Sequence, residues 1–243
     1  MAKEMIRTAG KKLVARTVVD FIAYVRRRLS PPPMITVHDE SQRRAVMDSV
    51  DYADLNMQTS LCFGDVHEMW RYAFAQRSIP GMVLEFGVFR ARSTNFFARL
   101  TREPIHGFDS FEGLKEEWAG WMLTKGHFSL GGRMPEVASN VRLIKGWFDE
   151  TLPGFLSANP GAISFLHIDC DTYESTKCVL NLCACRIVPG TVVLFDEYFG
   201  YRGWRIGEFK AWHEFITQYR ITYSYRAFCG QAVLVTVDSA QNA

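Results

Sequence analysis

The chain has 243 residues, of which 48% are hydrophobic and 22% charged, values typical of a soluble protein that buries a core. They exclude a disordered, collagen-like or small disulfide-rich chain. Lysine and arginine number 28 against 26 aspartate and glutamate residues, and the net charge of +2 gives no general basic field for nucleic acid. Residues 1–30 nevertheless hold eight basic and two acidic side chains, so this segment carries +6 and the remainder −4.

The N-terminal segment predicts a basic amphipathic helix over residues 1–30, which ends at Ser30 before three prolines. Its apolar stretch is interrupted by Arg16 and Asp20, has no small-residue cleavage site and is too short to span a bilayer, so we expect no signal peptide or anchor. Six cysteines without a CxxC pair favour reduced thiols and a cytoplasmic protein. The helix is expected to act as a lid or an oligomer contact, or to lie on an anionic membrane surface.

Residues 39–78 have a weaker helical pattern, and from Gly81 onward short β-rich runs alternate with helical ones. The expected parts are a basic helix with its proline break at 1–33, a helical cap at 34–80 and a main domain at 81–243. The predicted strands of that domain are 82–86, 105–108, 141–144, 163–168 and 192–195, and the helical patterns lie near 92–101, 149–158, 173–186 and 205–219.

Strand and helix in alternation predict a parallel sheet that is covered on both faces. Segments 221–228 and 232–237 are separated by only three residues, too few for a parallel crossover, so they predict an antiparallel hairpin at the sheet edge. The sequence therefore predicts an α/β fold. It is a Rossmann-like, doubly wound sheet of seven strands, five parallel strands plus the C-terminal hairpin, with a helical extension before it.

Ligands of doubly wound sheets bind beyond the carboxyl ends of the strands, and two of these ends favour a nucleoside. Gly87 follows the first strand, and Ser93 and Thr94 stand where the next helix begins, without the GxGxxG or P-loop patterns. Asp109 ends the second strand 22 residues after Gly87, where an acid bonds the hydroxyls of a ribose. Because no phosphate-binding glycines are present, a nucleoside without a pyrophosphate is the better ligand, and S-adenosylmethionine is the common one.

Two further strand ends carry acids: Asp169 and Asp171 follow the fourth strand, and Asp196 and Glu197 follow the fifth. Four carboxylates this close would repel one another, so either a hard divalent cation such as Mg²⁺ neutralises them or some of them are protonated. The alternative is that these acids only cap helices, and Asp171 stands where it would cap the next helix.

Two other patterns are assigned no role. Tyr173 and Lys177 have the Tyr-x-x-x-Lys spacing of short-chain dehydrogenases, but no glycine fingerprint accompanies them, so we interpret the spacing as chance. The histidines, His167 among them, show no zinc-binding spacing, and a single histidine on a strand is more often a packed residue than a ligand.

Five segments, 84–94, 108–114, 141–153, 167–176 and 195–198, together resemble the macrocin O-methyltransferase family of class I S-adenosylmethionine-dependent methyltransferases. The likeness covers about residues 65–237 and implies the seven-stranded sheet of that class. It implies that Glu85 and Gly87 hold the methionine end of the cofactor and Asp109 the ribose. The residues implied to contact the cofactor are Glu85, Gly87, Val88, Phe89, Ser93, Thr94, Asp109, Ser110, Phe111, Gly146, Trp147, Phe148 and Asp169.

The same resemblance assigns the acids. It implies Mg²⁺ ligands at Asp169, Asp196 and Glu197, and a general base at Asp171. Ala91 stands where the family prefers glycine, and Glu197 where many members have aspartate. The residues after the fifth strand are equally suited to form an acceptor pocket or to pack the last helix; they are Tyr198, Tyr201, Trp204 and Arg205.

The resemblance thus implies a Mg²⁺-assisted O-methyltransferase that uses S-adenosylmethionine to methylate a hydroxyl of a sugar or glycosylated small molecule, and a homo-oligomer is expected. The alternatives are a metal-independent small-molecule methyltransferase and an inactive cofactor-binding or scaffold protein. Nucleic-acid methylation is disfavoured, because Asp169-Cys170-Asp171-Thr172 stands where amino-methylating DNA enzymes carry an Asp/Asn-Pro-Pro-aromatic motif.

Overall fold

The computed structural model describes residues 18–21, 35–118, 120–121 and 123–240, and the chain divides into two compact units at 1–40 and 41–243. Within the first unit, residues 18–21 form one helical turn. The rest of the basic helix predicted over 1–30, and the proline break after it, lie outside the described residues. No helix in the described part of the chain is both long and apolar enough to cross a membrane.

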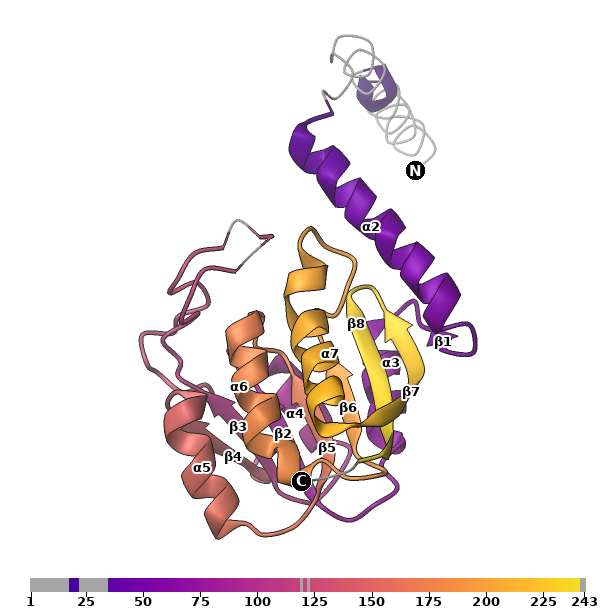
Figure 1. The fold of residues 1–243 in the computed structure, drawn as a ribbon. Coiled ribbons are helices and arrows are strands. Elements are labelled where there is room, and N and C mark those ends of the chain that lie inside the picture. Colours follow the sequence, from indigo (N-terminus) through magenta and orange to yellow (C-terminus); the bar gives the residue numbers. More distant parts are fainter. Residues whose placement is uncertain (1–17, 22–34, 119, 122, 241–243) are drawn as a thin grey trace, which may run out of the picture. The chain divides into compact units, whose positions relative to one another are not determined.

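One mixed sheet forms the centre of the second unit (Figure 1). All seven predicted strands are present, and β8 runs antiparallel to both of its neighbours, as the predicted hairpin requires. The strand order is β1-β7-β8-β6-β5-β2-β3-β4. The strands are β1 (Leu61–Cys62), β2 (Met82–Phe86), β3 (Ile105–Asp109), β4 (Val141–Lys145), β5 (Ile163–Ile168), β6 (Val192–Phe195), β7 (Thr222–Cys229) and β8 (Ala232–Ser239).

The strand β1 was not predicted and adds an eighth strand to the sheet. It pairs in parallel with β7 through only two residues, too few to show a sequence period. It also divides the helical region predicted over 39–78. Helix α2 (Val37–Asn56) precedes the strand, and α3 (Val66–Ala75) follows it with Asp65 as its N-cap, whose carboxylate accepts the Glu68 N–H at 3.0 Å.

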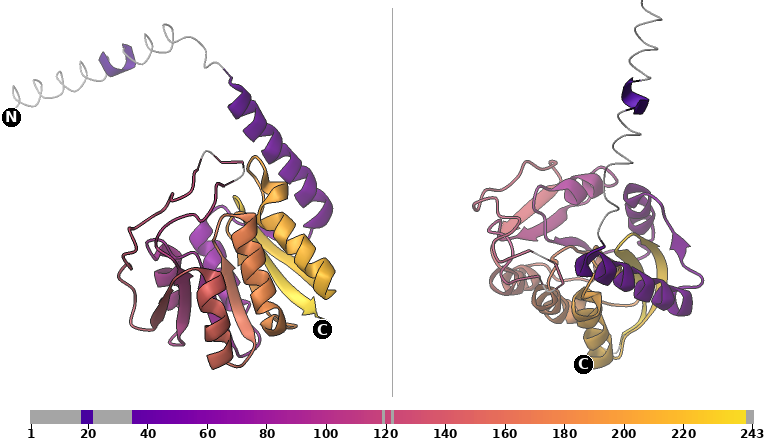
Figure 2. Two further views of the ribbon diagram at one scale, coloured as in Figure 1. Left: turned by 60° about the vertical axis from the view of Figure 1, so that its left-hand side comes forward. Right: turned by 90° about the horizontal axis from the view of Figure 1, so that it is seen from above.

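Helices cover both faces of the sheet, which confirms the doubly wound prediction (Figure 2). Apolar side chains of α3 and α4 pack on one face, and those of α5, α6 and α7 pack on the other. The bounds of the helices after α3 are α4 (Arg92–Ala98), α5 (Phe148–Ala158), α6 (Tyr173–Cys183) and α7 (Glu208–Tyr219), with 3₁₀ turns η1 (Ala184–Arg186) and η2 (Trp204–Ile206).

Two connecting segments lie next to the carboxyl ends of the strands. Residues 110–140 join β3 to β4 as a long segment whose described residues form no helix or strand (Figure 1). The segment between β6 and α7 is held by α2, where Ser49 Oγ accepts the Gly200 N–H at 2.8 Å and Asp48 binds Arg205 at 2.8 Å. These segments directly follow β3 and β6 in the chain. They therefore border any ligand that binds at the carboxyl ends of the strands.

Candidate active site

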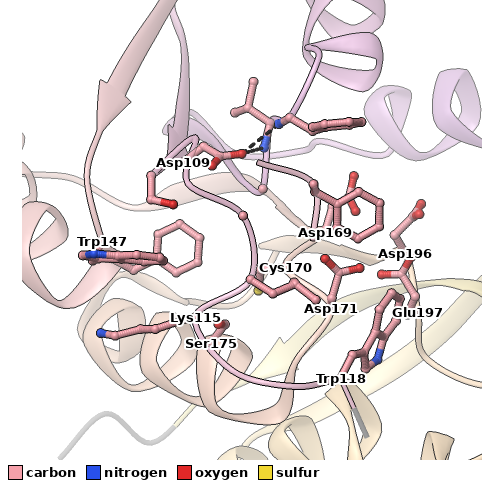
Figure 3. A pocket seen from close by; sticks show the side chains of 18 of the residues that line it. Asp109, Lys115, Trp118, Trp147, Asp169, Cys170, Asp171, Ser175, Asp196 and Glu197 are labelled. Carbon is pink, nitrogen blue, oxygen red and sulfur yellow. Dashed lines mark hydrogen bonds between the residues drawn. The ribbon is translucent and has the colours of Figure 1, made fainter. Parts of the chain in front are cut away.

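A cleft of about 660 Å³ lies at the carboxyl ends of β2, β3, β5 and β6, where the strand order predicts a ligand site. It brings together most of the residues that the sequence singled out. The predicted site residues that line it are Gly87, Val88, Phe89, Ser93, Asp109, Ser110, Trp147, Phe148, Asp169, Asp171, Asp196 and Glu197. Figure 3 shows the four acids of β5 and β6 on one side and Asp109 and Trp147 on the other.

The turn after β2 requires glycine at its first position. Gly87 has φ +90°, and a Cβ there would lie 1.6 Å from the carbonyl oxygen of Asp169. The turn continues through Phe89 at φ +46° and Ala91 at φ +57°, so two residues with side chains also adopt the left-handed conformation. Glycine adopts this angle more readily than alanine, which fits the glycine that the resemblance implies at the position of Ala91.

Hydrogen bonds to the carboxylate of Asp109 link the end of β3 to this turn. Its Oδ2 accepts the N–H groups of Val88 at 2.9 Å and Phe89 at 2.8 Å, and its Oδ1 accepts the Phe111 N–H at 2.6 Å. A carboxylate oxygen accepts about two hydrogen bonds, so Oδ1 has one position left for a ligand. The acid predicted to hold a ribose is thus fixed in place by backbone donors before any ligand binds (Figure 3).

The opposite side of the cleft is an acid cluster, which we define as Asp169, Asp171, Asp196 and Glu197. Asp169, Asp171 and Glu197 each offer a carboxylate oxygen, and these atoms lie within 4.8 Å of one another. Burial, followed by the charge of Asp196, raises the pKa of Asp171 to about 8 and also raises the pKa values of Asp169 and Glu197. Such a set of converging oxygens suits a divalent cation.

Asp171 does not cap α6, so that alternative for this acid is wrong. The N-cap is Thr172, whose hydroxyl accepts the Ser175 N–H at 3.3 Å. Asp171 instead adopts φ +64° and lines the cleft beside Glu197. A left-handed aspartate is uncommon, and such conformations persist where the surrounding structure fixes them.

Four residues that were implied to contact the cofactor do not line the cleft: Glu85, Thr94, Phe111 and Gly146. Glu85 is only 1% exposed, and its Oε1 accepts a hydrogen bond from His167 Nδ1 at 2.9 Å beneath the cleft. Thr94 and Phe111 are buried as well. These side chains support the walls of the cleft rather than forming its surface.

Of the residues considered for an acceptor pocket, Tyr198, Tyr201, Trp204 and Arg205, none is among the described residues that line the cleft. Tyr198 is fully buried, and its hydroxyl lies 2.6 Å from that of Tyr225 on β7. Arg205 binds Asp48, and Trp204 packs edge-on against Phe209 of α7 at 4.7 Å. The structure therefore packs Tyr198, Trp204 and Arg205 around Phe209 of the last helix, whereas Tyr201 packs against Trp118 and Trp121.

The segment 110–140 supplies lining residues that the sequence did not identify. Trp118 lines the cleft, and Tyr201 supports it indirectly through a ring contact of 6.1 Å. Lys115 also lines the cleft and binds Asp149 at 2.9 Å, while Glu116 accepts a hydrogen bond from Thr172. The segment has no periodicity, so only its length and its place after β3 indicated a role at the site.

A fifth acid, Glu208, lies under the cluster and was also missed. It is fully buried at the start of α7, and its Oε2 accepts the Glu197 N–H at 3.1 Å. Burial is the main cause that raises the pKa of Glu208. An acid in the first turn of a helix is ordinary in sequence, so nothing in the pattern distinguished it.

Comparison with known proteins shows which family this part of the chain resembles. Residues 84–198 match the model of the protein family described as "Methyltransferase domain". That stretch contains the glycine turn, Asp109 and the whole acid cluster. This part of the chain is therefore similar to a methyltransferase domain, and the fold is the Rossmann-like fold of methyltransferases.

The curated relative 8-demethyl-8-(2,3-dimethoxy-alpha-L-rhamnosyl)-tetracenomycin-C 4'-O-methyltransferase of Streptomyces olivaceus is 32% identical over 145 residues. The aligned region spans 49% of this chain and about half, 54%, of that relative. Among solved structures, the calicheamicin methyltransferase CalS11 matches with a TM-score of 0.57 at 22% identity, over 83% of this chain and 93% of that one. The O-methyltransferase NovP matches with a TM-score of 0.57 at 20% identity, over 71% and 79%. At these identities the two structures establish the fold alone.

Proposed function

We propose that the protein is an S-adenosylmethionine-dependent O-methyltransferase whose acceptor is a hydroxyl of a sugar or glycosylated small molecule. The observation that carries this proposal is the juxtaposition, in one cleft, of a glycine turn braced by Asp109 and a cluster of four acids. The first arrangement suits a nucleoside, and the second suits a divalent cation and a proton acceptor. In this proposal residues 81–243 form the catalytic domain, with 34–80 as its cap.

The cofactor would lie on the glycine-turn side. The remaining acceptor position on Asp109 Oδ1 is suited to a ribose hydroxyl, and Trp147 and Phe148 on the same side offer apolar surface to the adenine. When bound, S-adenosylmethionine supplies an activated methyl group, so the residues of the chain have chiefly to position the acceptor oxygen in line with it.

The acid cluster fits a divalent cation. The oxygen atoms of Asp169, Asp171 and Glu197 converge within 4.8 Å, Asp196 also lines the cleft, and Glu197 Oε2 is buried without a hydrogen-bond partner in the described structure. Asp169, Asp196 and Glu197 are the ligands we propose. When bound, a cation such as Mg²⁺ would hold acceptor oxygens and favour ionisation of the attacking hydroxyl.

Asp171 is the proposed general base. Its carboxylate lies in the cleft next to the proposed ligands, and a pKa of about 8 makes it a better proton acceptor than an ordinary aspartate. We assign the acceptor to the part of the cleft bordered by Trp118, Phe128 and Glu174, away from Trp147. Support for a sugar comes from the name of the curated relative, which acts on a rhamnosyl group.

Calorimetry with S-adenosylhomocysteine, with and without Mg²⁺, tests the proposal without knowledge of the acceptor. We expect binding in the micromolar range, and tighter binding of the cation in the presence of the product cofactor. Absence of any binding would leave the scaffold alternative. Methyl transfer to rhamnosyl glycosides, measured with and without EDTA, then separates a cation-assisted enzyme from a metal-independent one, since only the first loses turnover.

A further inference from the structure

A buried pair of polar side chains, Glu85 and His167, lies beneath the acid cluster. The two residues are register partners on the adjacent strands β2 and β5, so their side chains project from the same face of the sheet. That face is otherwise apolar, and the rings of Phe97 and Trp70 lie 5.4 Å and 6.3 Å from the imidazole. Glu85 is 1% exposed and His167 is 0% exposed. Burying polar groups in an apolar layer is costly unless they are hydrogen-bonded, and Glu85 Oε2 and His167 Nε2 have no partner in the described structure.

The hydrogen bond between them fixes the orientation of the imidazole. His167 Nδ1 lies 2.9 Å from Glu85 Oε1, and a carboxylate only accepts, so Nδ1 carries the hydrogen. The other ring nitrogen, Nε2, is buried and has no hydrogen-bond partner in the described structure. It lies 4.0 Å from Asp196 Oδ1. A lone pair is thereby held towards the acid cluster.

The 4.0 Å between His167 Nε2 and Asp196 Oδ1 is about twice a usual metal–ligand distance of roughly 2.0–2.2 Å, so one cation can bind both atoms. Asp196 and Asp169 both line the cleft, and Glu85, His167 and Asp169 form a second group whose ligand atoms lie within 4.8 Å. Histidines that bind metals typically donate their other ring N–H to a carboxylate, which is the arrangement that Glu85 provides. The geometry therefore favours a cation at this position.

We propose that His167 is a nitrogen ligand of the cation site, held by Glu85 and acting together with Asp169 and Asp196. This inference rests on the proposed use of a divalent cation and sharpens it, because an imidazole ligand favours Mn²⁺, Co²⁺ or Zn²⁺ over Mg²⁺. The site is then a mixed nitrogen and oxygen site at the carboxyl ends of β5 and β6, rather than a set of carboxylates alone.

The direct test uses the full chain loaded with Mn²⁺ and labelled with ¹⁵N-histidine. We expect electron spin-echo spectra to show a ¹⁵N coupling to the metal, and calorimetry to give at least about tenfold tighter binding of Mn²⁺ than of Mg²⁺. Bound Mn²⁺ without a ¹⁵N coupling would overturn the inference. Neither measurement depends on turnover or on S-adenosylhomocysteine binding, so a failure here is distinguishable from a failure of the proposed activity.

Histidine variants show which residue gives the ¹⁵N coupling to the metal. His167→Asn keeps an amide near the position of Nδ1, where it can still bond Glu85, but has no atom at Nε2. We expect it to lose the coupling and to weaken Mn²⁺ binding by about tenfold or more, while S-adenosylhomocysteine affinity stays within about twofold. The matched control is His106→Asn on β3, which is separated from β5 by β2 and where the imidazole packs on Phe155 instead. Unchanged Mn²⁺ affinity in His167→Asn would contradict the proposal.

If His167→Asn does not fold, the wild-type coupling still decides the question. His67 is another imidazole near the cleft, since its Nε2 lies 3.1 Å from Arg92, which lines the cleft. In that case we expect the ¹⁵N coupling to persist in both His67→Asn and His106→Asn. Loss of the coupling in either variant would assign it to that histidine and overturn the role of His167.

Discussion

The acids on the two sides of the cleft differ in how their negative charge is compensated. On the glycine-turn side, Asp109 accepts three backbone N–H groups, so its charge is offset by the fold itself. On the other side, Asp169, Asp171 and Glu197 converge within 4.8 Å, and none has a salt-bridge partner in the described part of the chain. Hydrogen bonds preorganise the first side, whereas the carboxylates of the second side need a bound proton or cation to offset their charge.

The largest effect is expected from the acid side. Asp171→Asn removes the proposed proton acceptor, and we expect kcat to fall by about 10²- to 10⁴-fold while S-adenosylhomocysteine affinity is retained. Transfer of a labelled methyl group measures the rate. Asp51→Asn is the matched control, because it makes the same replacement at an exposed aspartate of α2 that is not among the residues lining the cleft. Full activity in Asp171→Asn would mean that another group accepts the proton.

Gly87 connects the two sides of the cleft, because its backbone lies against the carbonyl oxygen of Asp169. Gly87→Ala introduces a Cβ at 1.6 Å from that oxygen and a side chain at φ +90°. We expect a loss of about 2–5 kcal/mol in the free energy of unfolding, measured by urea titration. Gly126→Ala is a useful control, because its φ of +82° is similar but no atom lies within 4 Å of the added Cβ. Equal losses in the two variants would show that backbone strain, and not the close contact, dominates.

The preorganised side is tested by Asp109→Asn. The asparagine amide keeps one acceptor oxygen but carries no charge. Its NH₂ group is a donor, and it would face backbone N–H groups. We expect S-adenosylhomocysteine affinity to fall by about 10- to 100-fold, because a charge-assisted hydrogen bond contributes about 1.5–3 kcal/mol. Calorimetry measures this, with the exposed Glu112→Gln as control. An unchanged affinity would remove Asp109 from the ribose site.

The smallest effect is a dependence of stability on pH. The pKa of Asp171 is raised from 3.8 to about 8, so the protonated carboxyl favours the folded state at low pH, and that contribution disappears as the pH rises from about 4 through 8. In metal-free protein we therefore expect Asp171→Asn to have a higher Tm than the wild type at about pH 8, with the difference narrowing towards pH 5. Differential scanning calorimetry measures both. A difference that widens on acidification would contradict the raised pKa.

The sequence was sufficient for the architecture because that information is local and periodic. Alternating β-rich and helical runs located all seven long strands, and a three-residue connection was enough to predict the antiparallel β7–β8 hairpin. It also located the cleft, since ligands gather at the carboxyl ends of parallel strands. It missed β1, whose two residues have no period, and the lining residues of 110–140, which follow no regular pattern.

Tertiary structure decided what each candidate side chain contacts. Glu85 and His167 are 82 positions apart in the chain, and only the β2–β5 register makes them partners. Tyr201 was suited equally to a pocket or to packing, and its place against Trp118 was settled by the path of the segment after β6. Sequence therefore determined which chemical groups reach one end of the sheet. The three-dimensional packing determined which of them are satisfied by hydrogen bonds and which are left facing one another, because pairing depends on distances between residues remote in sequence.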